Sequence, residues 1–258
     1  MKTYNNFNSA ILDIHQDFKE NAVKIHTEKW QGMDISKRPE AATFELLNYA
    51  FAVEGISEDI NIHRKDIMPN LPWADDHFLE RIGGLPINPG EQWKHWPWSN
   101  SADKFRDQNG QFNHNYMERY WPKYANKGKD GEPNEGIRFN YGDLRDIISQ
   151  LNNEPQTRQA YMPIFFPEDT GAVHGGRVPC SLGYHFIYRN GLLHINYYLR
   201  SCEVYRHFRD DCYLTVRLLL WVLDELRKLD KKWDSVSPGT YWMYITSFHC
   251  FVNDMRLL

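Results

Sequence analysis

Large apolar side chains occupy every second position in two short runs that follow Cys180. These alternating positions are Leu182, Tyr184, Phe186 and Tyr188, and then Leu193, Ile195, Tyr197 and Leu199. Asn190-Gly191 separates the two runs, and this dipeptide is the strongest short-range signal of a two-residue hairpin turn. The pattern therefore predicts an antiparallel β-hairpin that begins just after Cys180.

Other parts of the chain show helical or strand-like patterns. A helical period marks the first thirty residues, with apolar positions at Phe7, Ile11, Leu12, Ile14, Phe18 and Val23. The pattern also predicts a long buried helix over 213–229, a helix over 141–151 that ends near Asn152-Asn153, and a strand over 241–251. Residues 44–53 fit either a strand or a helix. Helices and strands mix without a regular βαβ alternation, which predicts an α+β fold or a mixed sheet.

Two segments are rich in turn-forming residues. Residues 69–97 hold five prolines and Gly83-Gly84, and we expect mostly loop there. Residues 123–136 form the most polar stretch, which indicates a surface insertion rather than a domain boundary. A chain of 258 residues fits one domain over 1–258, long enough to bury a sizeable core.

Composition narrows the classes of function. The net charge of −4 gives no field that would draw the chain onto nucleic acid or an anionic membrane, so we expect neither partner. No apolar run reaches the length of a membrane span, and the first residues do not begin a signal peptide. The four cysteines form no CxxC pair, which predicts reduced thiols in the cytoplasm and no metal site. Aromatic residues make up 15% of the chain, as in a ring-rich core or in a pocket for a flat ligand.

Cys180 opens the first strand of the predicted hairpin. An isolated cysteine is usually an inert core residue, whereas a reactive thiol needs a nearby cation. An antiparallel hairpin brings the start of its first strand beside the end of its second, so Arg200 and Ser201 should lie close to Cys180. Arg200 would then favour the thiolate and could bind a phosphate, with Ser201 as a further donor. A surface arginine that ends a strand is the alternative.

Four short motifs stand out around the predicted hairpin: Thr157-Arg158, Pro179-Cys180, Arg200-Ser201-Cys202-Glu203-Val204 and Phe208-Arg209-Asp210-Asp211. In these motifs the segment from Arg158 to Asp211 resembles the thymidylate synthase superfamily. Looser matches extend the resemblance to 38–251, namely Phe78-Leu79-Glu80-Arg81, Asn115-Tyr116 with Trp121, and Ile245-Thr246-Ser247-Phe248-His249. The resemblance implies a thymidylate synthase-like mixed sheet flanked by helices, in a homodimer.

The resemblance also implies the chemistry. Cys180 is expected to add to C6 of a pyrimidine nucleotide, which makes C5 nucleophilic towards the one-carbon unit of 5,10-methylenetetrahydrofolate. Glu80 is implied as the general acid/base, with Glu45 as a rival for that role and a solvated helix glutamate as the bland alternative. Tyr116 is implied in the wall of the nucleophile's pocket, although a core tyrosine would give the same pattern.

A phosphate site is implied around Arg200 and Ser201. Arg158 would be lent to it by the second subunit of the homodimer. Gln159 stands where the family usually has a second arginine, which removes one positive charge from the site.

The remaining sugar and phosphate contacts are implied more loosely. Arg38 is expected to supply a loop arginine that closes over the phosphate, with Lys37 as a rival. His249 would bind the ribose. Phe251 stands where the family has a tyrosine that contacts the 3′-hydroxyl, so both CMP and dCMP stay open as substrates.

Asp211 stands at the position that reads the base in this family. Members that act on uracil resemble one another in having asparagine there, whereas a carboxylate accepts from the cytosine N4–H donor. The resemblance is therefore closest to the deoxycytidylate (or cytidylate) 5-hydroxymethyltransferase branch. Alternatively, Asp210 or Asp211 caps the helix expected to begin near Tyr213.

The cofactor site departs from the family pattern. Glu203 replaces an aspartate that contacts the folate pterin. Seven residues follow Phe251, so we expect no C-terminal closing segment. A site that admits water fits hydroxymethylation better than methylation, which needs a dry pocket for hydride. Thymidylate synthase-like methylation of dUMP and a catalytically silent nucleotide-binding protein are the two alternatives.

Overall fold

The computed structural model describes residues 1–30, 33–112, 114–122, 142–170 and 177–258. The polar insertion expected at 123–136 lies outside the described residues. Seven of the described strands form one mixed sheet in the order β1-β5-β9-β8-β7-β6, with β2 paired to β5. These strands are β1 (Lys2–Tyr4), β2 (Val23–Ile25), β5 (Thr43–Val53), β6 (Tyr161–Pro163), β7 (Ser181–Arg189), β8 (Leu192–Glu203) and β9 (Ser237–Phe251). The expected α+β class with a mixed sheet is confirmed.

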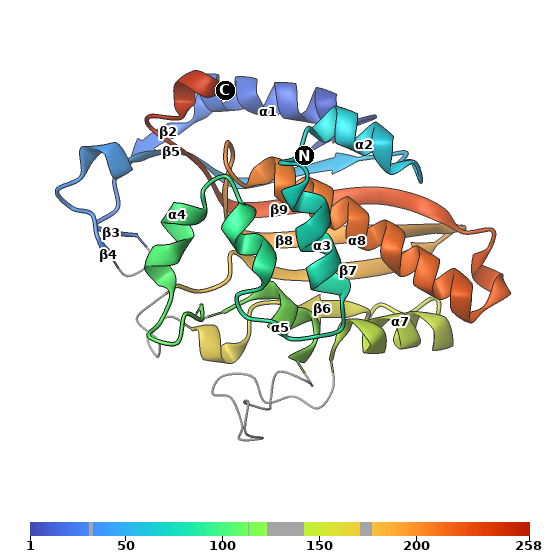
Figure 1. Ribbon diagram of the computed structural model, residues 1–258. Coiled ribbons are helices and arrows are strands. Elements are labelled where there is room, and N and C mark those ends of the chain that lie inside the picture. Colours follow the sequence, from blue (N-terminus) through green and yellow to red (C-terminus); the bar gives the residue numbers. More distant parts are fainter. Residues whose placement is uncertain (31–32, 113, 123–141, 171–176) are drawn as a thin grey trace.

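Helices lie in front of one face of this sheet (Figure 1). The longest, α8, packs against β8 and β9, and α2, α3 and α7 pack against α8 in turn. The helices are α1 (Phe7–Asn21), α2 (Ile60–Ile67), α3 (Trp73–Ile82), α4 (Ser99–Ala102), α5 (Tyr116–Tyr120), α7 (Leu144–Asn153) and α8 (Phe208–Leu229). A separate two-stranded ribbon joins β3 (Lys29–Trp30) to β4 (Met33–Asp34).

The predicted hairpin is confirmed. Strands β7 and β8 pair in antiparallel register, with Ser181 opposite Leu199 at the open end. Asn190 and Gly191 at the turn both have positive φ angles, 51° and 78°, which is the geometry of a type I′ turn. The hairpin therefore brings Cys180, the residue before β7, beside the end of β8.

Several element boundaries differ from the sequence prediction. Residues 44–53 are a strand, and Val23 belongs to β2 instead of the first helix. The loop expected over 69–97 contains the ten-residue helix α3, because Pro72 precedes its first turn and leaves the helix interior free of proline. Helix α8 begins at Phe208 and β9 at Ser237, several residues before the expected starts.

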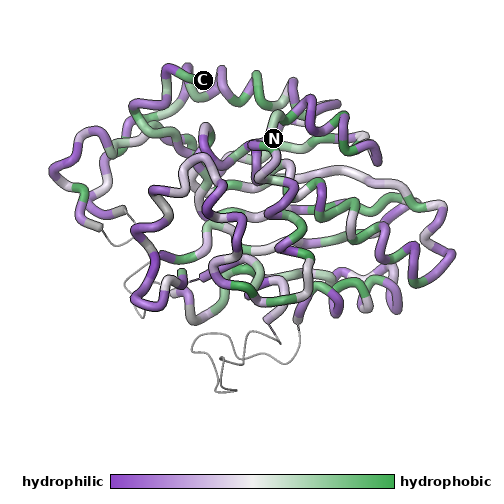
Figure 2. The backbone as a smooth tube through the Cα atoms, viewed as in Figure 1, coloured by the Kyte–Doolittle hydropathy of each residue, from purple (hydrophilic) through white to green (hydrophobic). Residues whose placement is uncertain are grey.

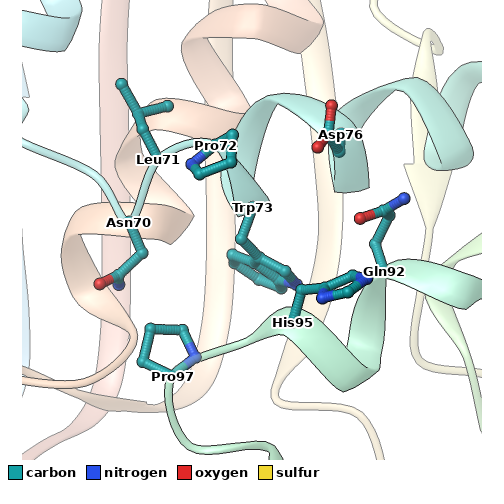
Figure 3. A pocket seen from close by; sticks show the side chains of 8 residues that line it. All are labelled: Asn70, Leu71, Pro72, Trp73, Asp76, Gln92, His95 and Pro97. Atoms are coloured by element: carbon teal, nitrogen blue, oxygen red, sulfur yellow. The ribbon is translucent and has the colours of Figure 1, made fainter.

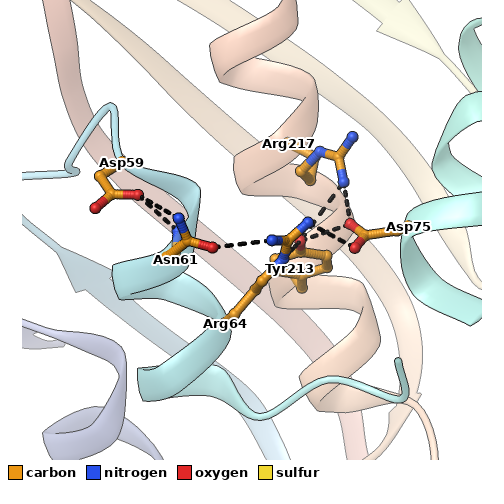
Figure 4. Close-up of polar contacts among 6 residues, drawn as sticks. All are labelled: Asp59, Asn61, Arg64, Asp75, Tyr213 and Arg217. Carbon is orange, nitrogen blue, oxygen red and sulfur yellow. Dashed lines mark hydrogen bonds and ion pairs between the residues drawn. The ribbon is translucent and has the colours of Figure 1, made fainter. Parts of the chain in front are cut away.

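A polar network holds α2, α3 and α8 together (Figure 4). Asp75 of α3 accepts a hydrogen bond from the Tyr213 hydroxyl (2.7 Å) and forms ion pairs with Arg64 (2.7 Å) and Arg217. Arg217 also lies over the Phe78 ring, 4.4 Å from its centroid. The network fixes α3 against α8, and both helices contribute residues to the cavity described below.

The opposite face of the sheet carries a row of tyrosines. Tyr198 stacks on Tyr244 at 5.1 Å between ring centroids, and Tyr161 lies 6.3 Å from Tyr198 on the other side. Tyr161 reaches across β7 because Gly183 has no side chain, since a Cβ there would lie 2.3 Å from the Tyr161 hydroxyl. Tyr161 remains 39% exposed, so this aromatic row is open to solvent in the single chain.

Hydrophobic and hydrophilic residues alternate along α1 and α8, as expected of helices that bury one side (Figure 2). The core beneath them is rich in rings, and Tyr120, Trp121, Tyr184 and Trp233 are each at most 1% exposed. Part of the high aromatic content therefore belongs to the core. None of the helices in the described parts of the chain combines the length and the apolarity that crossing a membrane would require.

Candidate functional site

A cavity of about 400 Å³ opens where β8 and β9 end and α3, α5 and α8 begin to cover the sheet. Seven residues expected in the active site line it: Tyr116, Cys180, Arg200, Ser201, Glu203, Asp211 and His249. Tyrosine and tryptophan side chains contribute to the wall, so some of the chain's aromatic residues form a pocket as well as a core. The volume lies in the range of small-molecule sites.

Cys180 lies directly before β7 and is half-buried, whereas Cys202, Cys212 and Cys250 are buried free thiols. The hairpin places Arg200 beside it as expected, with Nη2 of Arg200 4.0 Å from the cysteine sulfur. Burial raises the pKa of the other three thiols, which disfavours their thiolates. Cys180 is therefore the thiol that the structure presents to a ligand.

Arg200 also holds the segment that leads to Cys180. Its Nε donates to the Pro179 carbonyl (2.7 Å), and its Nη2 donates to the Val178 carbonyl (3.0 Å). The backbone N–H of Arg200 donates to the Cys180 carbonyl at 2.9 Å. These bonds restrain the chain segment that leads to Cys180. They also keep a positive charge close to its sulfur.

Tyr116 begins α5, where the Asn115 side chain caps the helix by accepting from the Met117 N–H. Its hydroxyl lies 3.0 Å from the Ser181 hydroxyl, which in turn contacts the Tyr197 hydroxyl. Burial raises the pKa of Tyr116, so its hydroxyl keeps its proton and can donate. Ser181, the middle member of this chain of hydroxyls, is the residue next to Cys180.

Asp210 and Asp211 have different surroundings. Asp210 accepts from the backbone N–H and the side-chain amide of Asn70, both at 2.8 Å. Both aspartates line the cavity, but the Asp211 carboxylate contacts the Cys202 thiol at 3.6 Å instead of an amide. Burial raises the pKa of Asp211 to about 7, although the charge of Arg81 opposes the shift. Neither aspartate is the N-cap of α8, because that helix begins at Phe208, so the capping alternative is wrong.

Glu203 and His249 are paired in register where β8 and β9 run parallel. One Glu203 oxygen accepts from the Arg206 backbone N–H, whereas the buried Oε1 has no hydrogen-bond partner among the described residues. Burial raises the pKa of Glu203 to about 7. His249 lies 3.4 Å from the Ser201 hydroxyl through Nδ1, and burial lowers its pKa, which favours the neutral ring.

Glu80 does not line the cavity. Its carboxylate accepts from the Gln92 backbone N–H (3.0 Å) and lies 3.4 Å from Nδ1 of His77. Its rival Glu45 does line the cavity and accepts from the Ser247 hydroxyl. The structure therefore places Glu45 within reach of a ligand in the cavity, whereas Glu80 lies outside the cavity wall.

Arg38, Lys37 and Arg158 are exposed and lie outside the cavity of their own chain. The Arg38 carbonyl is 3.2 Å from Nε2 of His26, and the Arg158 carbonyl is 3.1 Å from Nε2 of His185. A site for Arg158 across a subunit interface requires this exposure, and it stays a prediction.

Several residues of the cavity wall were missed from the sequence, among them Arg81, Arg177 and His207. Arg177 stands three positions before Cys180, and this proximity was the available signal for it. Burial and the charge of Arg177 lower the pKa of His207 to about 3, so His207 is neutral. The wall thus carries Arg81, Arg177 and Arg200 around one half-buried thiol.

No family model and no curated protein matches this chain.

A second, more open cavity of about 490 Å³ lies at the start of α3 (Figure 3). Its wall includes Asn70, Asp76, Gln92 and His95, and Trp73 lines both cavities. The Trp73 ring therefore stands between the two.

Proposed function

We propose that this protein is a folate-dependent 5-hydroxymethyltransferase that acts on a cytidine monophosphate, dCMP or CMP. The observation that carries the proposal is the position of Cys180. Its half-buried thiol lies 4.0 Å from the Arg200 guanidinium, in a cavity whose wall also holds Asp211. A nucleophile, a cation and a base-reading carboxylate thus share one ligand-sized space.

Cys180 supplies the covalent step. Its thiolate adds to C6 of the pyrimidine. The π electron pair of the C5–C6 double bond then shifts onto C5 and its conjugated neighbours, so C5 becomes nucleophilic. After C5 has gained its substituent and lost its proton, the S–C6 bond breaks and the thiolate leaves. The Arg200 guanidinium, with Nη2 4.0 Å from the sulfur, lies beside the thiolate at both ends of this cycle.

Asp211 supports cytosine as the base. An ionised carboxylate accepts from the cytosine N4–H donor, and a protonated one also donates to N3. Because burial raises the pKa of Asp211 to about 7, both forms are accessible near neutral pH. Uracil presents O4 in place of the N4 donor, so a carboxylate at this position disfavours it.

The phosphate would be bound by Arg200, Ser201 and Arg177. Arg177 lines the cavity, and its charge replaces the one that is missing at Gln159. Arg158 of a second subunit would complete the site in a homodimer. The open row of Tyr161, Tyr198 and Tyr244 supports this assembly, because an exposed aromatic sheet face suits a matching face of a second copy.

Glu203 fits the cofactor that the resemblance implies, since its buried Oε1 is an unused acceptor in the cavity wall. Such an acceptor suits the N–H edge of a pterin. When bound, 5,10-methylenetetrahydrofolate supplies the one-carbon unit.

Release of tritium from [5-³H]CMP, [5-³H]dCMP and [5-³H]dUMP tests the proposal. We expect methylenetetrahydrofolate to raise the rate of release from a cytidine nucleotide far above the rate of exchange without it, together with a 5-hydroxymethyl product. Release from dUMP alone, with dihydrofolate as product, would support the thymidylate synthase-like alternative. Binding of nucleotide with no release would support a silent nucleotide-binding protein, a reading that the position of Glu80 outside the cavity favours.

A further inference from the structure

Arg81 is a buried cation in the wall of the Cys180 cavity. Its side chain comes from α3, is 3% exposed, and lines the same space as Cys180 and Asp211. Its Cζ lies 4.2 Å from the centroid of the Tyr116 ring. Within the described part of the chain, no carboxylate comes within ion-pair distance of its guanidinium. A buried charge is costly unless it is compensated, so this arrangement points to a group that meets negative charge on a ligand.

A short relay of side chains holds Arg81 in place. Its Nε donates to Nε2 of His77 at 3.0 Å, and Nδ1 of His77 lies 3.4 Å from Glu80. His77 is fully buried and stacks on Trp73 with ring centroids 4.9 Å apart. Accepting from Arg81 requires a neutral imidazole, and burial lowers the pKa of His77 to about 4. The Trp121 indole also anchors the helix backbone by donating to the Arg81 carbonyl at 2.8 Å.

The relay leaves the terminal nitrogens of Arg81 for a ligand. Its Nε is used by His77, whereas Nη1 and Nη2 make no hydrogen bond to any residue that the structure describes. Arg81 also interacts electrostatically with Asp211. Burial raises the pKa of this carboxyl, and the charge of Arg81 partly opposes that increase. Arg81 and Asp211 therefore act on the same part of the cavity.

We propose that Arg81 is a catalytic residue that stabilises the negative charge formed on the pyrimidine ring when Cys180 adds to C6, with His77 and Glu80 as positioning residues. This inference rests on the proposed function. In that step the sulfur electron pair forms the S–C6 bond, and the displaced π pair spreads over C5, N3 and the C2 oxygen. A fixed guanidinium that is only 3% exposed stabilises such charge more strongly than one in bulk water. This negative charge on the pyrimidine ring is absent before Cys180 adds, so Arg81 acts on turnover more than on nucleotide binding.

Exchange of the C5 hydrogen for solvent deuterium, followed by NMR without folate, isolates this step. Thiolate addition at C6 lets C5 take a deuteron, and loss of the original proton followed by expulsion of the thiolate returns a labelled nucleotide. The variants are Arg81→Met, which keeps the length of the side chain without charge, and Arg81→Lys, which keeps a charge. Arg119→Met is the matched control. Arg119 is also buried, but it lies outside the cavity wall and forms an ion pair with Asp169 at 2.6 Å.

We expect Arg81→Met to lower kcat for exchange by about 100-fold or more, with a nucleotide Kd within about threefold of the parent. Arg81→Lys should retain more of the activity, and Arg119→Met should exchange at the parent rate when folded. His77→Phe removes the acceptor for Nε and should lower kcat, whereas His77→Gln, which restores an acceptor, should recover it. The His77 pair keeps the test decisive if Arg81→Met does not fold.

The possible results separate failure of the Arg81 role from failure of the proposed function. If the parent shows exchange that depends on Cys180, and Arg81→Met or His77→Phe exchanges at the parent rate, the role of Arg81 is overturned and the proposed function stands. If the parent shows no such exchange with CMP, dCMP or dUMP, both proposals are overturned. A loss that lies wholly in nucleotide Kd also overturns the catalytic role.

Discussion

Arg200 and Cys180 are joined through both backbone and side chain. The Arg200 N–H donates to the Cys180 carbonyl at 2.9 Å, and Nη2 of Arg200 lies 4.0 Å from the sulfur. The same guanidinium binds the carbonyls of Val178 and Pro179. One residue therefore restrains the segment before the nucleophile and sets the charge beside it.

Arg200→Lys tests whether these two effects, the restraint of the segment and the charge beside the sulfur, need the guanidinium and not only a positive charge. Lysine keeps the positive charge but lacks the planar fork that reaches both carbonyls. We expect the free energy of unfolding to fall by about 1–3 kcal/mol in urea denaturation. Alkylation of Cys180 by iodoacetamide at neutral pH should slow by about tenfold, because the guanidinium that lies 4.0 Å from the attacking sulfur is gone. Arg145→Lys, at an exposed ion pair of 3.6 Å to Glu225, is the control and should change neither quantity. Parent-like alkylation of Arg200→Lys would contradict the account.

Asp211→Asn should change the choice of base. Asparagine offers a donor to O4 of uracil and an acceptor to its N3–H, so kcat/KM should move from cytidine towards uridine nucleotides by about 100-fold or more. Asp210→Asn is the matched control, since Asp210 is bound to Asn70. It should lower the free energy of unfolding by about 1–3 kcal/mol and leave the base preference unchanged. A preference that moves with Asp210 instead of Asp211 would refute this assignment.

Glu203 should make stability depend on pH. Burial raises its pKa to about 7 from an ordinary value of 4.5, so the native protein retains a proton that the unfolded chain loses between these values. Its contribution to stability is therefore fully present below about pH 4.5 and is lost as the pH rises through about 7. The difference in unfolding free energy between the parent and Glu203→Gln, from urea denaturation, should change across this window and level off on either side. A difference that is constant from pH 4 to 8 would exclude a raised pKa.

Arg158 should act across the subunit interface. Cys180→Ala and Arg158→Gln should each be nearly inactive alone, the first for lack of a nucleophile and the second for lack of the borrowed arginine. Random exchange of subunits in an equal mixture should restore about a quarter of the parental sites, because half of the dimers are mixed and each mixed dimer holds one complete site. Tritium release after mixing checks this. No recovery, or a monomer in analytical ultracentrifugation, would rule out the shared arginine.

The hairpin could be predicted from the sequence because its signals are local. Asn190-Gly191 sets the turn, the alternation sets the face, and the register then brings Arg200 to Cys180. Seven of the expected site residues meet in one cavity for the same reason, since most of them lie on β8, on β9 or at the start of α8.

The wall built by α3 could not be predicted in this way. Glu80 and Arg81 are neighbours in sequence, but successive residues on a helix point about 100° apart, and here only Arg81 lines the cavity. The five prolines of 69–97 also concealed this helix, because their number suggests loop whereas their positions leave 73–82 free of proline. The rotation of α3 is set by the contacts of Asp75 with α2 and α8, which are distant in sequence.

The start of α8 shows a similar limit. Two adjacent aspartates allow one to be structural and the other to face a ligand, and the sequence leaves the choice open. The partner that occupies Asp210 is Asn70, which lies 140 residues earlier in the chain. Only the tertiary structure identifies Asp211 as the carboxylate left for a ligand.

The central claim is that Cys180 forms the covalent bond to the nucleotide. The most direct measurement is tritium release from [5-³H]CMP and [5-³H]dCMP by Cys180→Ala beside Cys250→Ala, a matched removal of a buried thiol outside the cavity wall. We predict that Cys180→Ala is inactive while it still binds nucleotide, and that Cys250→Ala keeps parental activity when folded. Tritium release by Cys180→Ala at the parental rate would contradict the account.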